Sequence, residues 1–293
     1  MTQPYTHWNV LPHGKLSAID EGILTVVGQI RMPLMNLPRR MTVVRLNDSR
    51  LVVWSAIALD EQEMATFEAF GRPAFLIVPN DHHRLDARAW KDRYPQMQVV
   101  APEGSRAKVE AVVPVDTTAP DFGDPRVEFV TVSGTGDQEA ALIVRSPNGT
   151  TLVLNDVVGN IRSESGIGTS LLRIAGFAGN AAQIPRVVKL ALVRDPNALR
   201  EQLARWGEIA SLKRIVVSHG DTIEANPRET LRELADSPAS SESVASGRRA
   251  LRSAIAQALW IIARMLPSLS LNHAAFAPPA VTTPLGLFSP GMS

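Results

Sequence analysis

The chain has 293 residues, a length that accommodates one α/β domain of about 230 residues and a tail. Its formal net charge is only +1, from 30 basic and 29 acidic residues, so no strong field would attract nucleic acid or an anionic membrane. The chain contains no cysteine, which excludes disulfides, thiolate nucleophiles and cysteine-ligated zinc. We therefore expect a globular protein that has no nucleic-acid partner.

The first ten residues are polar and lack the basic-then-apolar pattern of a secretory signal. No uninterrupted apolar run reaches the roughly 18 residues that are needed to cross a bilayer. These features predict a cytoplasmic location and no transmembrane segment.

The first half of the chain alternates apolar runs with turn residues. We expect strands at residues 23–27, 41–46, 51–56, 74–78 and 98–101, and helices at residues 59–70 and 87–94. Asn47, Asp48 and Ser49 indicate a hairpin turn, and Gly71 ends the first helix. The run 107–115 is apolar and β-branched, a composition typical of strands.

The second half continues the same alternation. Strands are expected at residues 127–132, 140–145, 151–154 and 214–217, and a helix at residues 197–210. Asn148 and Gly149 stand between two apolar runs and predict a tight hairpin. The apolar stretch 167–192 is expected to form helices that line a pocket or a dimer contact.

The composition changes after Asp236, where serine and alanine become frequent. We expect a core domain at residues 1–236, a linker at 237–247, a basic amphipathic helix at 248–267 and a disordered tail at 268–293. The helix is predicted to pack against the core, a second copy of the chain or another partner, in preference to a membrane surface.

Three polar clusters, at residues 80–86, 155–156 and 218–221, each directly follow a predicted apolar strand. Strand ends are where α/β folds build their sites, so the clusters are expected to meet in space. They offer nitrogen and oxygen donors suited to zinc, iron or manganese, namely those of His82, His83, Asp86, Asp156 and His219.

The order and spacing of these clusters resemble the metallo-β-lactamase superfamily. In that superfamily a strand ends in His-x-His-x-Asp-His, a later hairpin strand ends in a metal-bridging Asp, and a late strand ends in His-Gly. Residues 76–83, 151–156 and 215–220 look like these three elements. The resemblance spans about residues 21–234 and implies a four-layer αββα sandwich, an α/β (α+β) fold.

The sequence is most similar to an uncharacterised branch in which the first motif is altered. The positions that fit this branch are Asn80, His83, Trp90, Tyr94, Pro95, Glu139, Asp156 and Asn160. Two alignments of the first motif remain open. If Asn80 takes the place of the first His, His82 survives as a ligand and Arg84 and Leu85 replace two others; if His82 takes that place, Asp86 keeps the carboxylate.

The resemblance also implies a His after the strand that precedes the late hairpin, but residues 133–137 contain none. A two-metal hydrolase needs about six or seven protein ligands, and this chain offers fewer in either alignment. We therefore expect at most one divalent ion, held by His82 or His83 together with Asp156 and His219, with or without Asp86, or no ion at all.

A carboxylate that does not bind the metal, Asp86 or Glu139, is the candidate general base. Asp86 has a second interpretation as an ion-pair partner of Arg84 on the opening helical turn.

Two functions remain open at this point. The first is a hydrolase-like enzyme that acts on a small-molecule ester, lactone or phosphoester. The alternative is a non-catalytic binding or interaction protein that retains the fold without metal.

Overall fold

The computed structural model describes residues 3–32, 35–162, 178–179 and 181–236. These residues belong to one compact unit, residues 1–244. The predicted linker, basic helix and tail at residues 237–293 lie outside the described residues. So do residues 167–177 and 180 of the predicted apolar stretch 167–192.

The first half of the chain forms a six-stranded sheet in the order β1-β2-β3-β4-β5-β6. Its strands are β1 Ser17–Asp20, β2 Ile23–Met32, β3 Met35–Arg45, β4 Arg50–Trp54, β5 Arg72–Ile77 and β6 Gln98–Val100. The first four are antiparallel, whereas β4, β5 and β6 are parallel because the helices α1 Glu61–Phe70 and α2 Ala87–Arg93 cross over between them.

The second half forms a four-stranded sheet in the order β12-β9-β8-β7. Its strands are β7 Val127–Thr131, β8 Ala140–Ser146, β9 Gly149–Leu154 and β12 Leu212–Val217. Gly149, with φ 127°, closes the predicted β8–β9 hairpin. After β9 come two short paired strands, β10 Ile161–Arg162 and β11 Ala178–Gly179, and two helices, α5 Arg186–Ala191 and α6 Pro196–Gly207. Because this long connection returns the chain to the start of the sheet, β12 pairs with β9 in parallel. Helix α7 Pro227–Asp236 follows β12.

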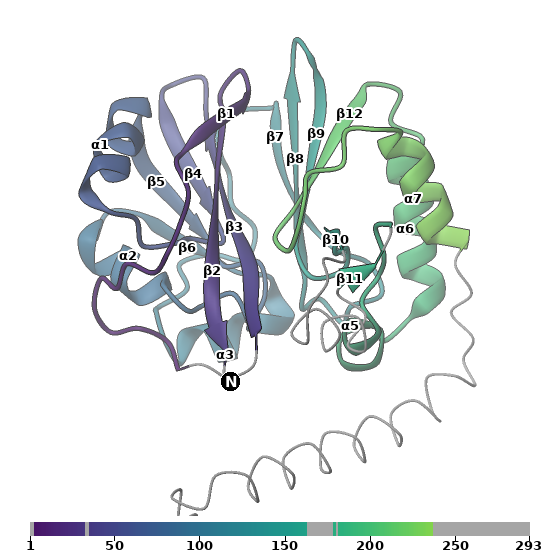
Figure 1. Cartoon of the computed structure of the whole chain (residues 1–293), viewed down its shortest axis with the longest axis horizontal. Helices are drawn as coiled ribbons and strands as arrows, with labels where there is room; N and C mark the ends of the chain where they lie inside the picture. Colours follow the sequence, from purple (N-terminus) through teal and green to yellow (C-terminus); the bar gives the residue numbers. More distant parts are fainter. Residues whose placement is uncertain (1–2, 33–34, 163–177, 180, 237–293) are drawn as a thin grey trace, which may run out of the picture. The chain divides into compact units, whose positions relative to one another are not determined.

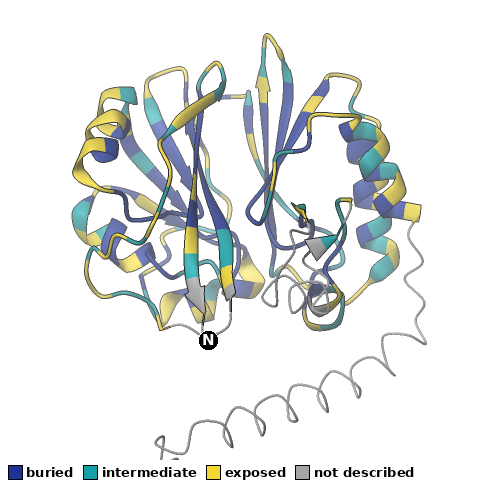
Figure 2. Ribbon diagram, in the orientation of Figure 1, coloured by how far each residue is buried: buried dark blue, intermediate teal, exposed yellow. Residues whose placement is uncertain are grey.

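Three apolar clusters hold four layers together (Figures 1 and 2). One lies between the first sheet and its helices and includes Phe67 and Trp90. A second lies between the two sheets and includes Trp54. The third lies between the second sheet and helices α6 and α7 and includes Trp206. The predicted αββα sandwich is therefore confirmed.

Aspartate side chains cap the N-termini of helices α1 and α6. Asp60 accepts a hydrogen bond from the backbone N–H of Glu63 at 2.9 Å, so α1 begins at Glu61, two residues after its predicted start. It ends before Gly71, where a Cβ would lie 2.5 Å from the carbonyl oxygen of Ser49. Asp195 caps α6 in the same way, ahead of its first-turn proline.

One expectation from composition is wrong. The β-branched run 107–115 is not a strand: it continues a short 3₁₀ turn, Glu103–Ser105, into the helix α3 Arg106–Glu110. Val109 and Val113 pack into the cluster beneath the first sheet, so their apolar bulk is buried without strand pairing. The outer side of β6 is instead bridged by Thr117, which pairs with Val100.

Within the part of the chain that the structure describes, no helix combines the length and the apolar character that a membrane span requires.

Candidate metal centre

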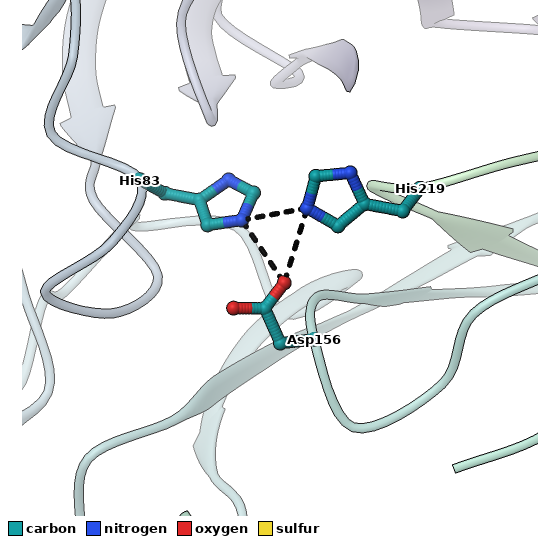
Figure 3. A group of neighbouring side chains, drawn as sticks. All are labelled: His83, Asp156 and His219. Atoms are coloured by element: carbon teal, nitrogen blue, oxygen red, sulfur yellow. Dashed lines mark hydrogen bonds and ion pairs between the residues drawn. The ribbon is translucent and has the colours of Figure 1, made fainter. Parts of the chain in front are cut away.

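Three side chains converge where the two sheets meet, and each follows a strand end (Figure 3). His83 lies in the loop after β5, Asp156 two residues beyond β9, and His219 two residues beyond β12. The Oδ1 atom of Asp156 is 3.1 Å from Nε2 of His83 and 3.2 Å from Nε2 of His219, and the two Nε2 atoms are 3.3 Å apart. The three ligand atoms thus form a nearly equilateral triangle.

The size of this triangle suits a small divalent ion. Donors bound at about 2.0–2.2 Å in a tetrahedral site lie about 3.3–3.6 Å from one another. The observed separations of 3.1–3.3 Å are close to one face of such a tetrahedron. Two imidazoles and one carboxylate are also a donor set that zinc, iron and manganese accept, so the residues fit a single ion.

The other nitrogen of each imidazole has a fixed partner. Nδ1 of His219 donates to the carbonyl oxygen of Pro38 at 2.7 Å, and Nδ1 of His83 lies 2.7 Å from Oγ of Ser55. Such outer contacts hold ligand imidazoles in one orientation in metal sites. They keep both Nε2 atoms directed at Asp156. Ser55 was not predicted from the sequence as part of the site.

Asn80 links the loop after β5 to the carboxylate of Asp156. Its Nδ2 donates to Oδ2 of Asp156 and to Oε2 of Glu139, each at 2.7 Å. Its Oδ1 accepts the backbone N–H groups of His82 and His83 at 2.8 and 3.2 Å. Asn80 is fully buried, so one amide both shapes the His83 turn and orients the Asp156 carboxylate.

Burial and the neighbouring charges shift the pKa values of Asp156 and Glu139 in opposite directions. Burial alone would raise the pKa of Asp156, but the charges and hydrogen bonds of His83 and His219 hold this pKa well below its usual range. Burial and then the charge of Asp156 raise the pKa of Glu139 well above its usual range. Asp156 is therefore the carboxylate that stays ionised.

The two imidazoles respond in opposite directions. Burial lowers the pKa of His83 by more than Asp156 raises it. Burial also lowers the pKa of His219, but its hydrogen bond to Asp156 and the charge of that carboxylate outweigh burial, so this pKa is raised. His219 is therefore the more basic of the two imidazoles and His83 the less basic.

The structure places the remaining predicted site residues outside the triangle. The side chain of His82 is 53% exposed, and its Nε2 lies 3.6 Å from Oδ1 of Asp81. Asp86 forms a buried ion pair with Arg39, and Glu139 accepts hydrogen bonds from Asn80 and from the backbone of Val157.

The suggested ion pair between Asp86 and Arg84 is not formed. Asp86 is paired with Arg39, while Arg84 donates to the carbonyl oxygen of Lys108. Arg39 was not recognised from the sequence, because it lies 47 residues from Asp86 along the chain. Its Nε and Nη2 atoms are buried and have no hydrogen-bond partner among the described residues.

A cavity of about 290 Å³ opens onto the triangle. Much of its wall is apolar and comes from both halves of the domain, with the side chains of Ile30, Leu37, Leu85, Val188 and Leu192. Arg39, Ser55 and His82 line it as well as the three converging residues, whereas Asp86 and Glu139 do not. The cavity is near the lower end of the size range of small-molecule sites.

No family model matches the chain, and no curated protein sequence matches it. Solved structures of similar fold do exist. A metallo-β-lactamase from Erythrobacter litoralis, solved with beta-mercaptoethanol in its active site, is similar at a TM-score of 0.54 and 11% identity, over 76% of this chain and 96% of that one. The DIM-1 metallo-β-lactamase is similar at a TM-score of 0.53 and 12% identity, over 78% of this chain and 99% of that one.

A third similar structure is the FIM-1 metallo-β-lactamase from Pseudomonas aeruginosa in its mono-zinc form, with a TM-score of 0.50 and 12% identity, over 78% of this chain and 96% of that one. The chain therefore has the metallo-β-lactamase fold. At such low identity the similarity establishes the fold and not the activity.

Proposed function

We propose that this protein is a hydrolase that uses one divalent metal ion, held by His83, Asp156 and His219, on a small molecule bound in the adjoining cavity. The observation that carries the proposal is the convergence of one carboxylate oxygen and two Nε2 atoms within 3.1–3.3 Å of one another. Three protein ligands with a further position open to water or substrate are typical of catalytic zinc sites.

The site supports one ion in preference to two. Among the described residues, His83, Asp156 and His219 are the one group of His, Cys, Asp and Glu side chains close enough to share an ion. Asn80 stands where one alignment expects a ligand, and its amide donates to Asp156. A donor that points its N–H group at the ligand carboxylate supports that ligand but does not bind a cation.

A divalent ion at this position supplies Lewis acidity toward a carbonyl or phosphoryl oxygen and toward a water molecule. Side chains and a backbone carbonyl group of the protein orient the three metal ligands. Ser55 and Pro38 keep the two imidazoles aligned, and Asn80 keeps the carboxylate aligned. Zinc is supported by the mono-zinc form of one structural neighbour, while iron and manganese accept the same donors.

The cavity supports a small ester, lactone or phosphoester that has an apolar portion. Ile30, Leu37 and Val188 offer apolar surface beside the three ligands. Asp86 and Glu139 do not line this cavity, so we assign them supporting roles: Asp86 holds Arg39, and Glu139 holds Asn80. Among the described residues that line the cavity, Asp156 is the one carboxylate, so a water that a bound ion would acidify has no separate carboxylate base there.

The test is elemental analysis of protein purified without a polyhistidine tag, after incubation with zinc, iron or manganese and removal of free metal. We expect about one ion per chain, lost in His219→Ala and retained in His82→Ala, because His82 lies outside the triangle. Protein that binds metal is then assayed on ester, lactone and phosphodiester panels. A folded protein that binds none of these ions would contradict the proposal and favour a binding role.

A further inference from the structure

A hydroxyl, an imidazole and a carboxylate are connected in series beside the cavity. Oγ of Ser55 is 2.7 Å from Nδ1 of His83, and Nε2 of the same ring is 3.1 Å from Oδ1 of Asp156. We propose that, when no metal is bound, Ser55 is a nucleophile that takes the acyl group of small carboxylic esters, with His83 as its base and Asp156 orienting the ring. This activity goes beyond the proposed metal-dependent function and does not depend on it.

The hydrogen-bond directions are consistent with this role. Asp156 only accepts, and Nε2 of His83 and Nε2 of His219 both lie within 3.2 Å of its Oδ1. In the proposed tautomer each Nε2–H donates to this oxygen, which leaves the Nδ1 lone pair of His83 free to accept from the Ser55 hydroxyl. A serine, a base within hydrogen-bond reach and a third group that orients the base are the requirements for an activated hydroxyl. The ring is used in the opposite sense to the serine proteases, with Nδ1 toward the serine.

The backbone fixes Ser55 directly after the last residue of its strand. Ser55 directly follows β4 and has φ 53°, a left-handed conformation that is uncommon for a residue other than glycine. Its N–H donates to the carbonyl oxygen of Ile77 at 3.1 Å, and Trp54 before it is buried between the sheets. Conformations of this kind cluster at active sites, and a strained turn after a strand presents the nucleophile of the α/β-hydrolases.

A donor for the developing oxyanion lies next to the serine. Ala56 lines the cavity, and among the described residues its backbone N–H has no acceptor. The N–H of the residue that follows the nucleophile is one of the two oxyanion donors in α/β-hydrolases. A single donor of this type contributes about 10²- to 10³-fold to the rate.

The reaction balances with an ester and water alone. Oγ of Ser55 bonds to the acyl carbon while its proton passes to Nδ1 of His83; the bond between the acyl carbon and the alkoxy oxygen then breaks, and the alkoxide takes that proton. Water attacks the acyl-serine by the same route in reverse and releases the acid. No oxidant, reductant or further cofactor is required.

A metal ion and this reaction exclude each other. An ion bound to Nε2 of His83 forces the ring proton to Nδ1, which then donates to Oγ of Ser55 and can no longer accept from it. Ser55 would thus orient His83 in the metal-bound protein and act as the nucleophile in the metal-free protein. Metal occupancy selects between the two.

The test uses the full chain, stripped of metal with EDTA and treated with a fluorophosphonate, which bonds to activated serine oxygens and releases fluoride. We expect one adduct per chain, on the peptide that carries Ser55, by intact-mass and peptide mass spectrometry. Stoichiometric zinc is expected to reduce labelling to the level of Ser55→Ala. His83→Gln is expected to slow labelling by at least about 100-fold, because the base is removed.

Two further variants keep the result interpretable. Ser55→Gly lacks the hydroxyl but tolerates φ 53°, so it separates loss of the nucleophile from misfolding and should not be labelled. Ser17→Ala removes an exposed serine hydroxyl of β1 and should be labelled at the wild-type rate. Folded metal-free protein without an adduct on Ser55, or equal labelling in His83→Gln, would overturn the inference. Failure to bind any metal would contradict the metal-dependent function and the effect of zinc on labelling, and would leave the role of Ser55 intact.

Discussion

The two halves of the domain contribute to the site in different ways. In the second half, Leu154 and Val217 are direct partners on the parallel strands β9 and β12. Asp156 and His219 each follow their strand by two residues, so the register alone brings the two side chains together. In the first half, one ligand candidate, His83, comes from an irregular loop whose shape depends on several buried contacts.

This difference shows how a site can change while its fold is retained. The second half keeps its two donors, Asp156 and His219, because the pairing of β9 with β12 places them next to each other. The first half has Asn80, Arg84 and Leu85 where one alignment to the superfamily expects ligands, and its buried carboxylate, Asp86, is paired with Arg39. We therefore expect substitutions of Asp156 or His219 in the second half to remove metal binding, and substitutions in the first half other than those of His83 to weaken the framework around it.

The largest effect is expected from Asp156→Ala. Both Nε2 atoms approach Oδ1 of Asp156 within 3.2 Å, so the loss of this carboxylate should abolish metal binding and not merely weaken it. Isothermal titration with zinc measures this directly. A matched test is His82→Ala, which should bind zinc as the unmodified protein does; equal losses in both variants would show that the triangle is not the metal site.

The next largest effect is expected from Arg39→Met, and it concerns stability. This change leaves the buried carboxylate of Asp86 without its ion-pair partner, which should lower the free energy of unfolding by about 3–5 kcal/mol. The double variant Arg39→Met and Asp86→Leu should recover most of that loss, because neither member of the buried pair remains. Denaturant unfolding measures both, and a double variant as unstable as the single one would contradict this account.

The sequence predicts the parts of the fold and the site that depend on local patterns, but not those that depend on contacts between distant residues. The succession of strands and helices along the chain, the hairpin at Gly149 and the meeting of three strand-end clusters follow from local patterns and the resemblance. The choice between His82 and His83 does not, because it is made by Asn80, whose side chain folds back onto both backbone N–H groups. The contact of Ser55 with His83 spans 28 residues, and no local pattern reports it.

A smaller effect is expected from Asn80→Ala. This variant removes the shared donor to Asp156 and Glu139 and the side-chain acceptor of the His82 and His83 N–H groups. The His83 N–H keeps only its 3.4 Å contact with the backbone carbonyl oxygen of residue 80. Outer contacts of this kind change metal affinity by about 10- to 100-fold. Zinc titration should therefore show weakened but measurable binding. Unchanged affinity would mean that the first half does not hold the carboxylate in place.

The smallest effect at neutral pH concerns Asp124, which connects the two halves away from the cavity. Its carboxylate accepts from the side chain of Arg126, just before β7, and from the backbone N–H of Asn47 in the β3–β4 turn, at 2.9 and 2.8 Å. The hydrogen bond from Arg126 is the main cause that lowers the pKa of Asp124 to about 2.

Because this pKa is lower in the folded protein than the value of about 3.9 in an unfolded chain, ionised Asp124 stabilises the fold above that unfolded value. The contribution, about 2 kcal/mol, should disappear as the pH falls from about 4 through 2. Unfolding of Asp124→Asn and of the unmodified protein across this range should therefore show a difference in stability that shrinks with acid, while zinc affinity at pH 7 is unchanged. A difference that is independent of pH would mean that the carboxylate's charge does not join the two halves.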